Sequence, residues 1–297
     1  MNRSPAGQVL VLSANLKKAQ ARDRVDSEIL NFMQRVPKAV PFAPDAVLLQ
    51  EVVESSAARV AALFEESTGF GFDVAVSPGP KPIVGTQEDQ VVVRNTAILL
   101  NSETMQAAGQ GGFVASRYSS RDAAPELKPR IKEHAHCLAR TKSGGIEVPL
   151  VSVHFVTNQK FAASTMGFCY KAQWAREVMN YLQSQYPRGD VPQVPVIGGD
   201  FNNRRCLRSR EKVVCEVLPF WHVLTEQGGF SDAVFERHGG SEKALADQMN
   251  GHKRIDYVFA RGVVRDASHD VGYEARRGDP DFYSDHRLLW ALVSPSG

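Results

Sequence analysis

The chain has 297 residues, of which 43% are apolar and 23% charged, and its 35 basic and 33 acidic side chains leave a net charge of +2. This composition excludes a disordered or fibrous protein, and the small net charge excludes a molecule whose overall field attracts a polyanion, so only local patches can do that. Because α/β folds of this length are often one compact unit, we expect a single domain over residues 1–297.

The cysteines and the N-terminus bear on the compartment. The four cysteines are widely spaced without a Cys-x-x-Cys pair, which argues against a zinc knuckle and a disulfide-dense secreted scaffold. The N-terminus lacks the long apolar core of a signal peptide, and no run of about 18 apolar residues could span a bilayer. We therefore expect a cytoplasmic protein with no membrane span, although a chain whose signal had been removed would look the same. The oligomeric state stays open.

Two strand–helix units are predicted in the first part of the chain. Val9–Leu12 is a short run rich in Val and Leu, typical of a strand buried on both faces, and Arg22–Val36 follows with helical spacing up to Pro37. Ala46–Leu49 and Ser55–Ser67 repeat this pairing of strand and helix.

The rest of the chain predicts loops, a long helix and four more strands. Three segments rich in Gly, Pro and Ser indicate loops or hairpin connections, namely Ser77–Gly85, Gln106–Gly112 and Ser119–Pro129. Phe161–Tyr186 has the pattern of a helix. The remaining strand-like runs are Leu150–Val153, Val194–Ile197, Ile255–Phe259 and Leu288–Val293. The last two carry their polar residues at the start, so we expect them to run antiparallel to the other strands in a mixed sheet.

Polar residues follow the ends of four of these strands. They are Asn15, Gln50 with Glu51, His154, and Asp200 with Asn202. Side chains just past the carboxyl ends of buried strands emerge together along one edge of a sheet. The repetition therefore predicts a single site.

The residue types fit the hydrolysis of a phosphate ester. This reaction needs a hard divalent cation, which prefers the oxygens of carboxylates and amides, and a base that is partly neutral near pH 7. His286 oriented by Asp256 can supply the base. Oxygen ligands are available from Glu51, Asp200, Asn15, Asn202 and Asp285. Taken singly, such residues at strand ends are more often turn or capping groups, so the hypothesis rests on their joint arrangement.

Six segments in order resemble the motifs of the endonuclease/exonuclease/phosphatase superfamily. They are Ser13-Ala14-Asn15, Leu49-Gln50-Glu51, Val153-His154-Phe155, Gly199-Asp200-Phe201-Asn202, Arg254-Ile255-Asp256-Tyr257 and Ser284-Asp285-His286. The resemblance extends from about Val9 to Val293. It implies a four-layer α/β/β/α sandwich, in which two mixed β-sheets are flanked by helices and the site lies at one end between the sheets.

The resemblance also implies a role for each site residue. Glu51 would be the main Mg²⁺ ligand, with Asn15 and Asp285 close to the metal, and Mn²⁺ could replace Mg²⁺. His286 would activate water with Asp256 as its orienting partner. Asp200 and Asn202 would position the water and bind a phosphoryl oxygen. His154 would bind the phosphate or protonate the leaving oxygen.

The substrate is less well defined. His154 after the Val-Ser-Val run resembles the deoxyribonuclease, sphingomyelinase and deadenylase branches, whereas abasic-site endonucleases commonly lack this histidine. The basic run from Arg204 to Lys212, which includes Arg205, either contacts successive phosphates or is a solvated face. Family nucleases often carry an arginine on the strand that corresponds to Lys128–His134. Spacing leaves Arg130, Lys132 and His134 as candidates, and we take Arg130 with Arg204 and Arg205 as substrate-binding residues.

We therefore expect a Mg²⁺-dependent hydrolase that cleaves phosphodiester bonds as a nuclease. Endonuclease or exonuclease action, and DNA or RNA preference, stay open. Two alternatives are a phosphoesterase for a small molecule or phospholipid and a non-catalytic binding domain that kept the fold. The presence of every expected polar residue counts against the last.

Overall fold

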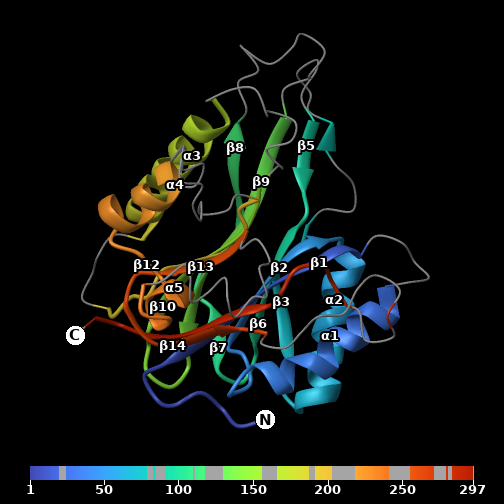
Figure 1. Ribbon diagram of the computed structural model, residues 1–297. Coiled ribbons are helices and arrows are strands. Elements are labelled where there is room, and N and C mark those ends of the chain that lie inside the picture. Colours follow the sequence, from blue (N-terminus) through green and yellow to red (C-terminus); the bar gives the residue numbers. More distant parts are fainter. Residues whose placement is uncertain are drawn as a thin grey trace.

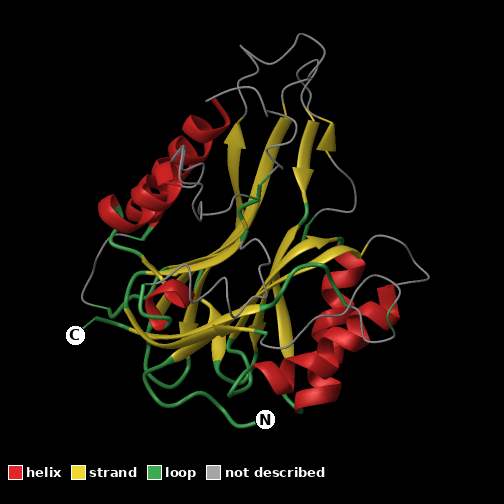
Figure 2. Cartoon of the chain, viewed as in Figure 1, coloured by secondary structure: helices red, strands yellow, loops and turns green. Residues whose placement is uncertain are grey.

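The computed structural model describes residues 1–19, 25–78, 83–84, 91–109, 111–117, 130–155, 166–186, 191–202, 218–240, 255–270, 279 and 283–296. Within these residues the chain forms two β-sheets packed face to face, with helices covering both outer faces (Figures 1 and 2). The predicted four-layer α/β/β/α sandwich is thus confirmed. No described helix has both the length and the apolar composition needed to cross a lipid bilayer.

The first sheet joins the two ends of the chain. Its order of strands is β14 (Val263–His269), β15 (Leu289–Ser294), β1 (Val9–Ala19), β2 (Ala46–Val52), β6 (Thr96–Asn101) and β3 (Phe72–Val76). Strands β1 and β2 are parallel, whereas β15 runs antiparallel to β1. The expected antiparallel direction of the last strand is therefore confirmed.

The second sheet is built around the long strand β9. Its order is β12 (Ser231–Asp232), β13 (Asp256–Ala260), β11 (Val196–Asp200), β10 (Glu147–His154), β9 (Arg130–Thr141), β5 (Val91–Arg94) and β4 (Ile83–Val84), while β7 (Met105–Ala107) and β8 (Gly112–Arg117) also pair with β9. Strands β10 and β11 are parallel, and β13 is antiparallel to β11. The four strands with polar ends are thus divided equally between two sheets, and do not share one.

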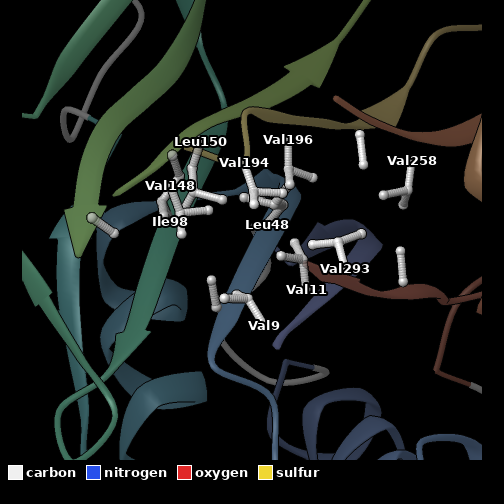
Figure 3. Close-up of a cluster of buried hydrophobic side chains, with 14 of the residues drawn as sticks. Val9, Val11, Leu48, Ile98, Val148, Leu150, Val194, Val196, Val258 and Val293 are labelled. Atoms are coloured by element: carbon white, nitrogen blue, oxygen red, sulfur yellow. The ribbon is translucent and has the colours of Figure 1, made fainter. Parts of the chain in front are cut away.

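Three apolar clusters separate the layers. One fills the space between the sheets, where Val11 and Leu48 of the first sheet meet Leu150 and Val196 of the second (Figure 3). A second cluster packs α1 (Val25–Ala39) and α2 (Glu54–Thr68) on the first sheet, and a third packs α3 (Met166–Gln185) and α4 (Leu218–His222) on the second. Full burial stabilises each aliphatic side chain by roughly 1.5–3 kcal/mol, so strands with apolar residues on both faces are held firmly.

Helix α1 differs from its predicted end. It continues through Pro37 to Ala39 and does not stop before the proline. Proline lacks one backbone donor, but Pro37 lies in the last turn, where Val40 N–H still donates to Val36 O at 3.0 Å. The predicted start at Arg22 lies outside the described residues. A separate short helix, α5 (Ala233–Arg237), packs against β13 and β14.

Candidate active site

Parallel pairing brings the polar ends of the strands level with one another. Asn15 on β1 is paired with Gln50 on β2, directly before Glu51. In the second sheet, His154 at the end of β10 is paired with Asp200 at the end of β11. The chain thereby places a carboxylate from each sheet at the same end of the sandwich, as the sequence predicts.

Two glycines beneath this end allow close approaches, one between the two sheets and one between β10 and β11 within the second sheet. A Cβ at Gly198 would lie 2.9 Å from Cδ1 of Leu48 across the sheet interface. Gly199 has φ of 142°, and a Cβ there would overlap the Val153 carbonyl oxygen on β10. The Val153 backbone thus excludes a side chain directly before Asp200, and a side chain at Gly198 would require Leu48 to shift.

Hydrogen bonds behind the site fix the spacing of the two sheets. Nε2 of Gln50 donates to Oγ of Ser152 at 3.0 Å, and the Ser152 hydroxyl donates to the Leu49 carbonyl at 2.9 Å. Both side chains are fully buried, where such bonds are not weakened by water. Gln50 directly precedes Glu51 in the first sheet, and Ser152 lies two residues before His154 in the second. These bonds therefore couple the two halves of the site.

Asp200 is the central acceptor. Its Oδ2 accepts from Nδ2 of Asn15 at 3.1 Å and from Nδ2 of Asn202 at 3.0 Å, while its Oδ1 accepts from the Asn202 backbone N–H at 2.7 Å. The side chain is almost fully buried. Burial and the nearby Asp256 carboxylate raise the pKa of Asp200 to about 7, although His286 and the Asn202 N–H act in the opposite direction.

Glu51 and Asn202 have strained backbones. Their φ angles of 55° and 49° lie in the left-handed region, which residues other than glycine rarely adopt. No other described residue except glycine has a positive φ. Such strain costs on the order of 1–3 kcal/mol and concentrates at functional positions. Asn15 donates to Oε1 of Glu51 at 3.4 Å, so this amide links the carboxylates of the two sheets.

His286 and Asp256 form a hydrogen-bonded pair. Nδ1 of His286 lies 2.9 Å from Oδ2 of Asp256, and its Nε2 lies 3.9 Å from Oδ2 of Asp200 and 3.9 Å from Oδ1 of Asp285. Burial alone would lower the pKa of His286, but the charge and hydrogen bond of Asp256, with the charges of Asp200 and Asp285, raise it to about 10. His286 is therefore protonated at neutral pH while these carboxylates are not neutralised.

His154 has different neighbours. Its Nε2 faces Oε1 of Glu51 at 3.6 Å and Oδ2 of Asp200 at 3.7 Å, whereas its Nδ1 faces Nδ2 of Asn95 at 2.5 Å and Nζ of Lys132 at 3.4 Å. Burial, followed by the positive charge of Lys132 and by the neighbouring imidazoles of His134 and His286, holds the pKa of His154 well below its usual value. The imidazole of His154 is therefore neutral.

The structure brings together most of the predicted residues. Asn15, Glu51, His154, Asp200, Asn202, Asp256 and His286 are linked by the contacts above, and Asp285 lies half-exposed beside His286. Arg204 and Arg205 lie outside the described residues, as does the side chain of Arg130, the first residue of β9. Sequence reasoning missed Asn95. On β9, the ammonium of Lys132 faces the ring of His154, and Nδ1 of His134 accepts the His154 backbone N–H, which are contacts that residue spacing could not reveal.

The donor set suits a hard divalent cation. Ligand atoms of Glu51, His154 and Asp200 lie within 4.8 Å of one another, as do those of Asp200, Asp256 and His286. Two carboxylates brought close together in a buried place repel each other, and a cation relieves that repulsion. The carboxylate oxygens among them are ligands of the kind that Mg²⁺ and Mn²⁺ prefer. The residues present therefore fit such an ion.

The fold and the site together define the class of this protein. It is an α/β/β/α sandwich in which carboxylates, amides and histidines converge at one end between two sheets. Within that class, the chain belongs to the Endonuclease/Exonuclease/phosphatase family, whose model matches residues 11–286. The name covers nucleases and phosphatases, which are hydrolases of phosphoester bonds.

Solved structures with the same fold come from distant relatives. An endonuclease/exonuclease/phosphatase from Bacteroides vulgatus has a TM-score of 0.61 and 14% identity, with 97% of this chain and 99% of that chain covered. TDP2 from C. elegans has a TM-score of 0.55 and 16% identity, with 97% and 75% covered. TDP2 from D. rerio, complexed with a single-strand DNA product, has a TM-score of 0.53 and 15% identity, with 96% and 98% covered. Comparison with curated proteins finds no match.

Proposed function

We propose that this protein is a Mg²⁺-dependent phosphodiesterase that acts on nucleic acid, with Mn²⁺ as an alternative ion. The observation that carries the proposal is the convergence of Glu51, Asp200 and the His286–Asp256 pair at the junction of the two sheets. The arrangement combines oxygen ligands for a cation with a histidine that a carboxylate orients. Glu51, Asn15 and Asp285 would hold the ion.

The attacking water would lie between His286 and Asp200. The 3.9 Å separation of Nε2 of His286 from Oδ2 of Asp200 allows both atoms to contact one water oxygen. Asp256 on Nδ1 orients the ring so that Nε2 takes the proton of this water. A bound divalent cation would offset the carboxylate charge that raises the pKa of His286 and would polarise the phosphoryl oxygens. Asn202 holds Asp200, and because its Nδ2 donates to Asp200 Oδ2 at 3.0 Å and to the Phe155 carbonyl at 2.7 Å, it would contact a phosphoryl oxygen only by exchanging one of these bonds.

Two observations support nucleic acid as the substrate. A protein of the same fold, TDP2 from D. rerio, is complexed with a single-strand DNA product. In this chain Lys132 adds a positive charge next to His154, on the side of the site away from Asp256. We propose Arg130, Arg204 and Arg205 as further phosphate contacts. A cytoplasmic location also stays a proposal, based on the spacing of the cysteines.

One experiment tests the reaction and the substrate class together. The same metal-free preparation, with and without Mg²⁺, is assayed on DNA, RNA, bis-nitrophenyl phosphate, inositol phosphates and sphingomyelin. We expect cleavage of DNA or RNA that EDTA abolishes and Mg²⁺ or Mn²⁺ restores. Full activity in chelator-treated protein would contradict the metal dependence. Activity on sphingomyelin or inositol phosphates alone would support the phosphoesterase activity and contradict the assignment as a nuclease. Binding without turnover would indicate a non-catalytic domain.

A further inference from the structure

The two histidines of the site have opposite surroundings at Nδ1. Nδ1 of His286 faces a carboxylate oxygen of Asp256 at 2.9 Å. Nδ1 of His154 faces the ammonium of Lys132 at 3.4 Å and the amide of Asn95 at 2.5 Å. A neutral imidazole carries one proton, and its neighbours decide which nitrogen holds it.

The ammonium decides the tautomer of His154. Lys132 has three donors and no acceptor, so the ring nitrogen that faces it must present a lone pair. The proton of His154 then lies on Nε2. The opposite holds for His286, because the Asp256 carboxylate can only accept, so Nδ1 of His286 must carry the proton. When His286 is neutral, one histidine therefore presents a donor to the site and the other presents an acceptor.

Asn95 alone leaves the choice open. As placed, its Nδ2 donates to His154, and its Oδ1 is buried without a hydrogen-bond partner among the described residues. With the amide turned over, Oδ1 would accept from an Nδ1–H, but that N–H would then point at Lys132. The backbone of Asn95 lies where the chain passes from β5 of the second sheet to β6 of the first, and its carbonyl accepts from Val52 N–H at 3.2 Å.

Nε2 of His154 points between the two carboxylates. It lies 3.6 Å from Oε1 of Glu51 and 3.7 Å from Oδ2 of Asp200, beyond hydrogen-bond distance from either. The backbone N–H of His154 donates to Nδ1 of His134 at 3.3 Å, which adds a second anchor at this end of β10. An N–H held in this place can donate to an oxygen that enters the gap.

We propose that Lys132 and Asn95 are positioning residues that fix His154 as the Nε2–H tautomer, so that His154 donates a hydrogen bond to a phosphoryl oxygen and transfers no proton. The statement about the phosphoryl oxygen rests on the proposed function. The statement about the tautomer does not, because it follows from the donors around Nδ1.

The first test reads the tautomer directly. Protein with ¹⁵N-labelled histidine rings is studied by NMR at neutral pH, with and without Mg²⁺, and the signals of His154 are identified by their loss in His154→Gln. We expect a protonated Nε2 and a lone pair on Nδ1 for His154, and a proton on Nδ1 of His286. A proton on Nδ1 of His154 would overturn the proposal. If the tautomer is as expected but no phosphoester is hydrolysed, only the proposed function fails.

The second test separates a donor from a proton carrier. His154→Ala should lower kcat on the order of 10² to 10³-fold, the effect of removing one donor to a developing negative charge. His154→Gln keeps an N–H donor but cannot exchange protons, so its kcat should be at least about tenfold above that of His154→Ala. Equal loss in the two variants would mean that His154 carries a proton.

The third test assigns the role of Lys132. Lys132→Met should lower kcat about 10- to 100-fold, as for other partners that orient a functional histidine, and should change the ring spectrum of His154. Lys132→Arg, which again offers only donors, should restore the spectrum. Lys142→Met, the same change at the far end of β9 where the ammonium donates to the Ser102 carbonyl, should alter neither. A raised KM with an unchanged spectrum in Lys132→Met would show a direct substrate contact and refute the positioning role.

Discussion

Individual residues of the site combine backbone strain with crowded charge. The left-handed backbone of Glu51 and the burial of Asp200 both cost stability. Side chains in such places are kept for what they bind. A residue that costs stability in the metal-free protein should therefore be replaceable without harm to folding.

Glu51→Gln tests this reasoning. The amide keeps the size of the side chain and removes one of the negative charges near Asp200, so the metal-free variant should melt at the same temperature or higher. Metal affinity should fall about tenfold or more, because even residues that only orient a ligand affect affinity 10- to 100-fold. Calorimetric titration with Mg²⁺ and thermal melting measure the two effects. A lower melting temperature with unchanged affinity would make Glu51 a structural residue.

The His286–Asp256 pair should behave as one unit. His286→Ala should lose on the order of 10² to 10⁴ in turnover, the range for a positioned general base. Asp256→Asn should lose nearly as much, since it removes the acceptor that holds Nδ1–H 2.9 Å away. The double variant should lose little more than either, because groups acting together are non-additive. The cycle is measured at saturating Mg²⁺, and strictly additive losses would show that the two residues act independently.

At the scale of the elements, the strands could be predicted and their partners could not. The short Val-rich runs indicate buried strands, because they place apolar side chains on both faces of the strand. Which sheet each strand joins depends on pairings with strands far away in the sequence. Strand β9 was expected only through the resemblance, over Lys128–His134, because it is not a continuous apolar run: Lys132, His134 and His136 are polar, although all three are buried. Asn95 was missed for a related reason, since nothing local marks the passage between sheets.

The close approach of β11 to β10 at Gly199 should not tolerate a side chain. Gly199→Ala would force a Cβ against the Val153 carbonyl at a φ of 142°, so β11 must shift relative to β10. We expect a loss of about 1–3 kcal/mol or more in the free energy of unfolding, as for overpacked sites, and a larger relative loss of activity because His154 and Asp200 are paired there. Urea unfolding and turnover measure both.

A matched glycine provides the control for this change. Gly144 lies in the turn after β9, and a Cβ there would meet Oγ1 of Thr141 at 3.7 Å, an ordinary contact. Gly144→Ala should leave activity unchanged and stability within about 0.5 kcal/mol. If Gly199→Ala behaves like Gly144→Ala, the close approach of β10 and β11 does not position the site.

At the scale of the whole molecule, the first and last strands of the described chain pair with each other. The first strand, β1, pairs with the last, β15, over Val9 to Ser13. This pairing supports the proposal that residues 1–297 form one domain. The segment Ser284-Asp285-His286 precedes β15 and is anchored to β1, because the Ser284 hydroxyl donates to the Asn15 carbonyl at 2.6 Å. Site and fold thus depend on the same closure, which no local pattern in the sequence reveals.

Buried histidines should make the whole molecule sensitive to acid. Burial, with the charge of Lys132, lowers the pKa of His134 from 6.5 to about 3, and the side chain is fully buried. Above pH 6.5 neither the folded nor the unfolded state is protonated at this residue, so its effect on stability is absent. As pH falls from 6.5 towards 3, His134 binds a proton in the unfolded chain but not in the folded protein, so the free energy of unfolding decreases.

The size of this effect follows from the shift. Each pH unit below 6.5 costs about 1.36 kcal/mol, so His134 should destabilise the protein by about 2 kcal/mol at pH 5 relative to a residue that does not titrate. His134→Gln can still accept from the His154 N–H and provides that comparison. Urea unfolding of both proteins from pH 8 to pH 4.5 should show a constant difference above pH 6.5 and a steadily growing relative advantage of His134→Gln below it. Because the titrations of Asp200 and His286 are common to both proteins, they cancel in this difference, and a difference independent of pH would mean that His134 is protonated in the folded state.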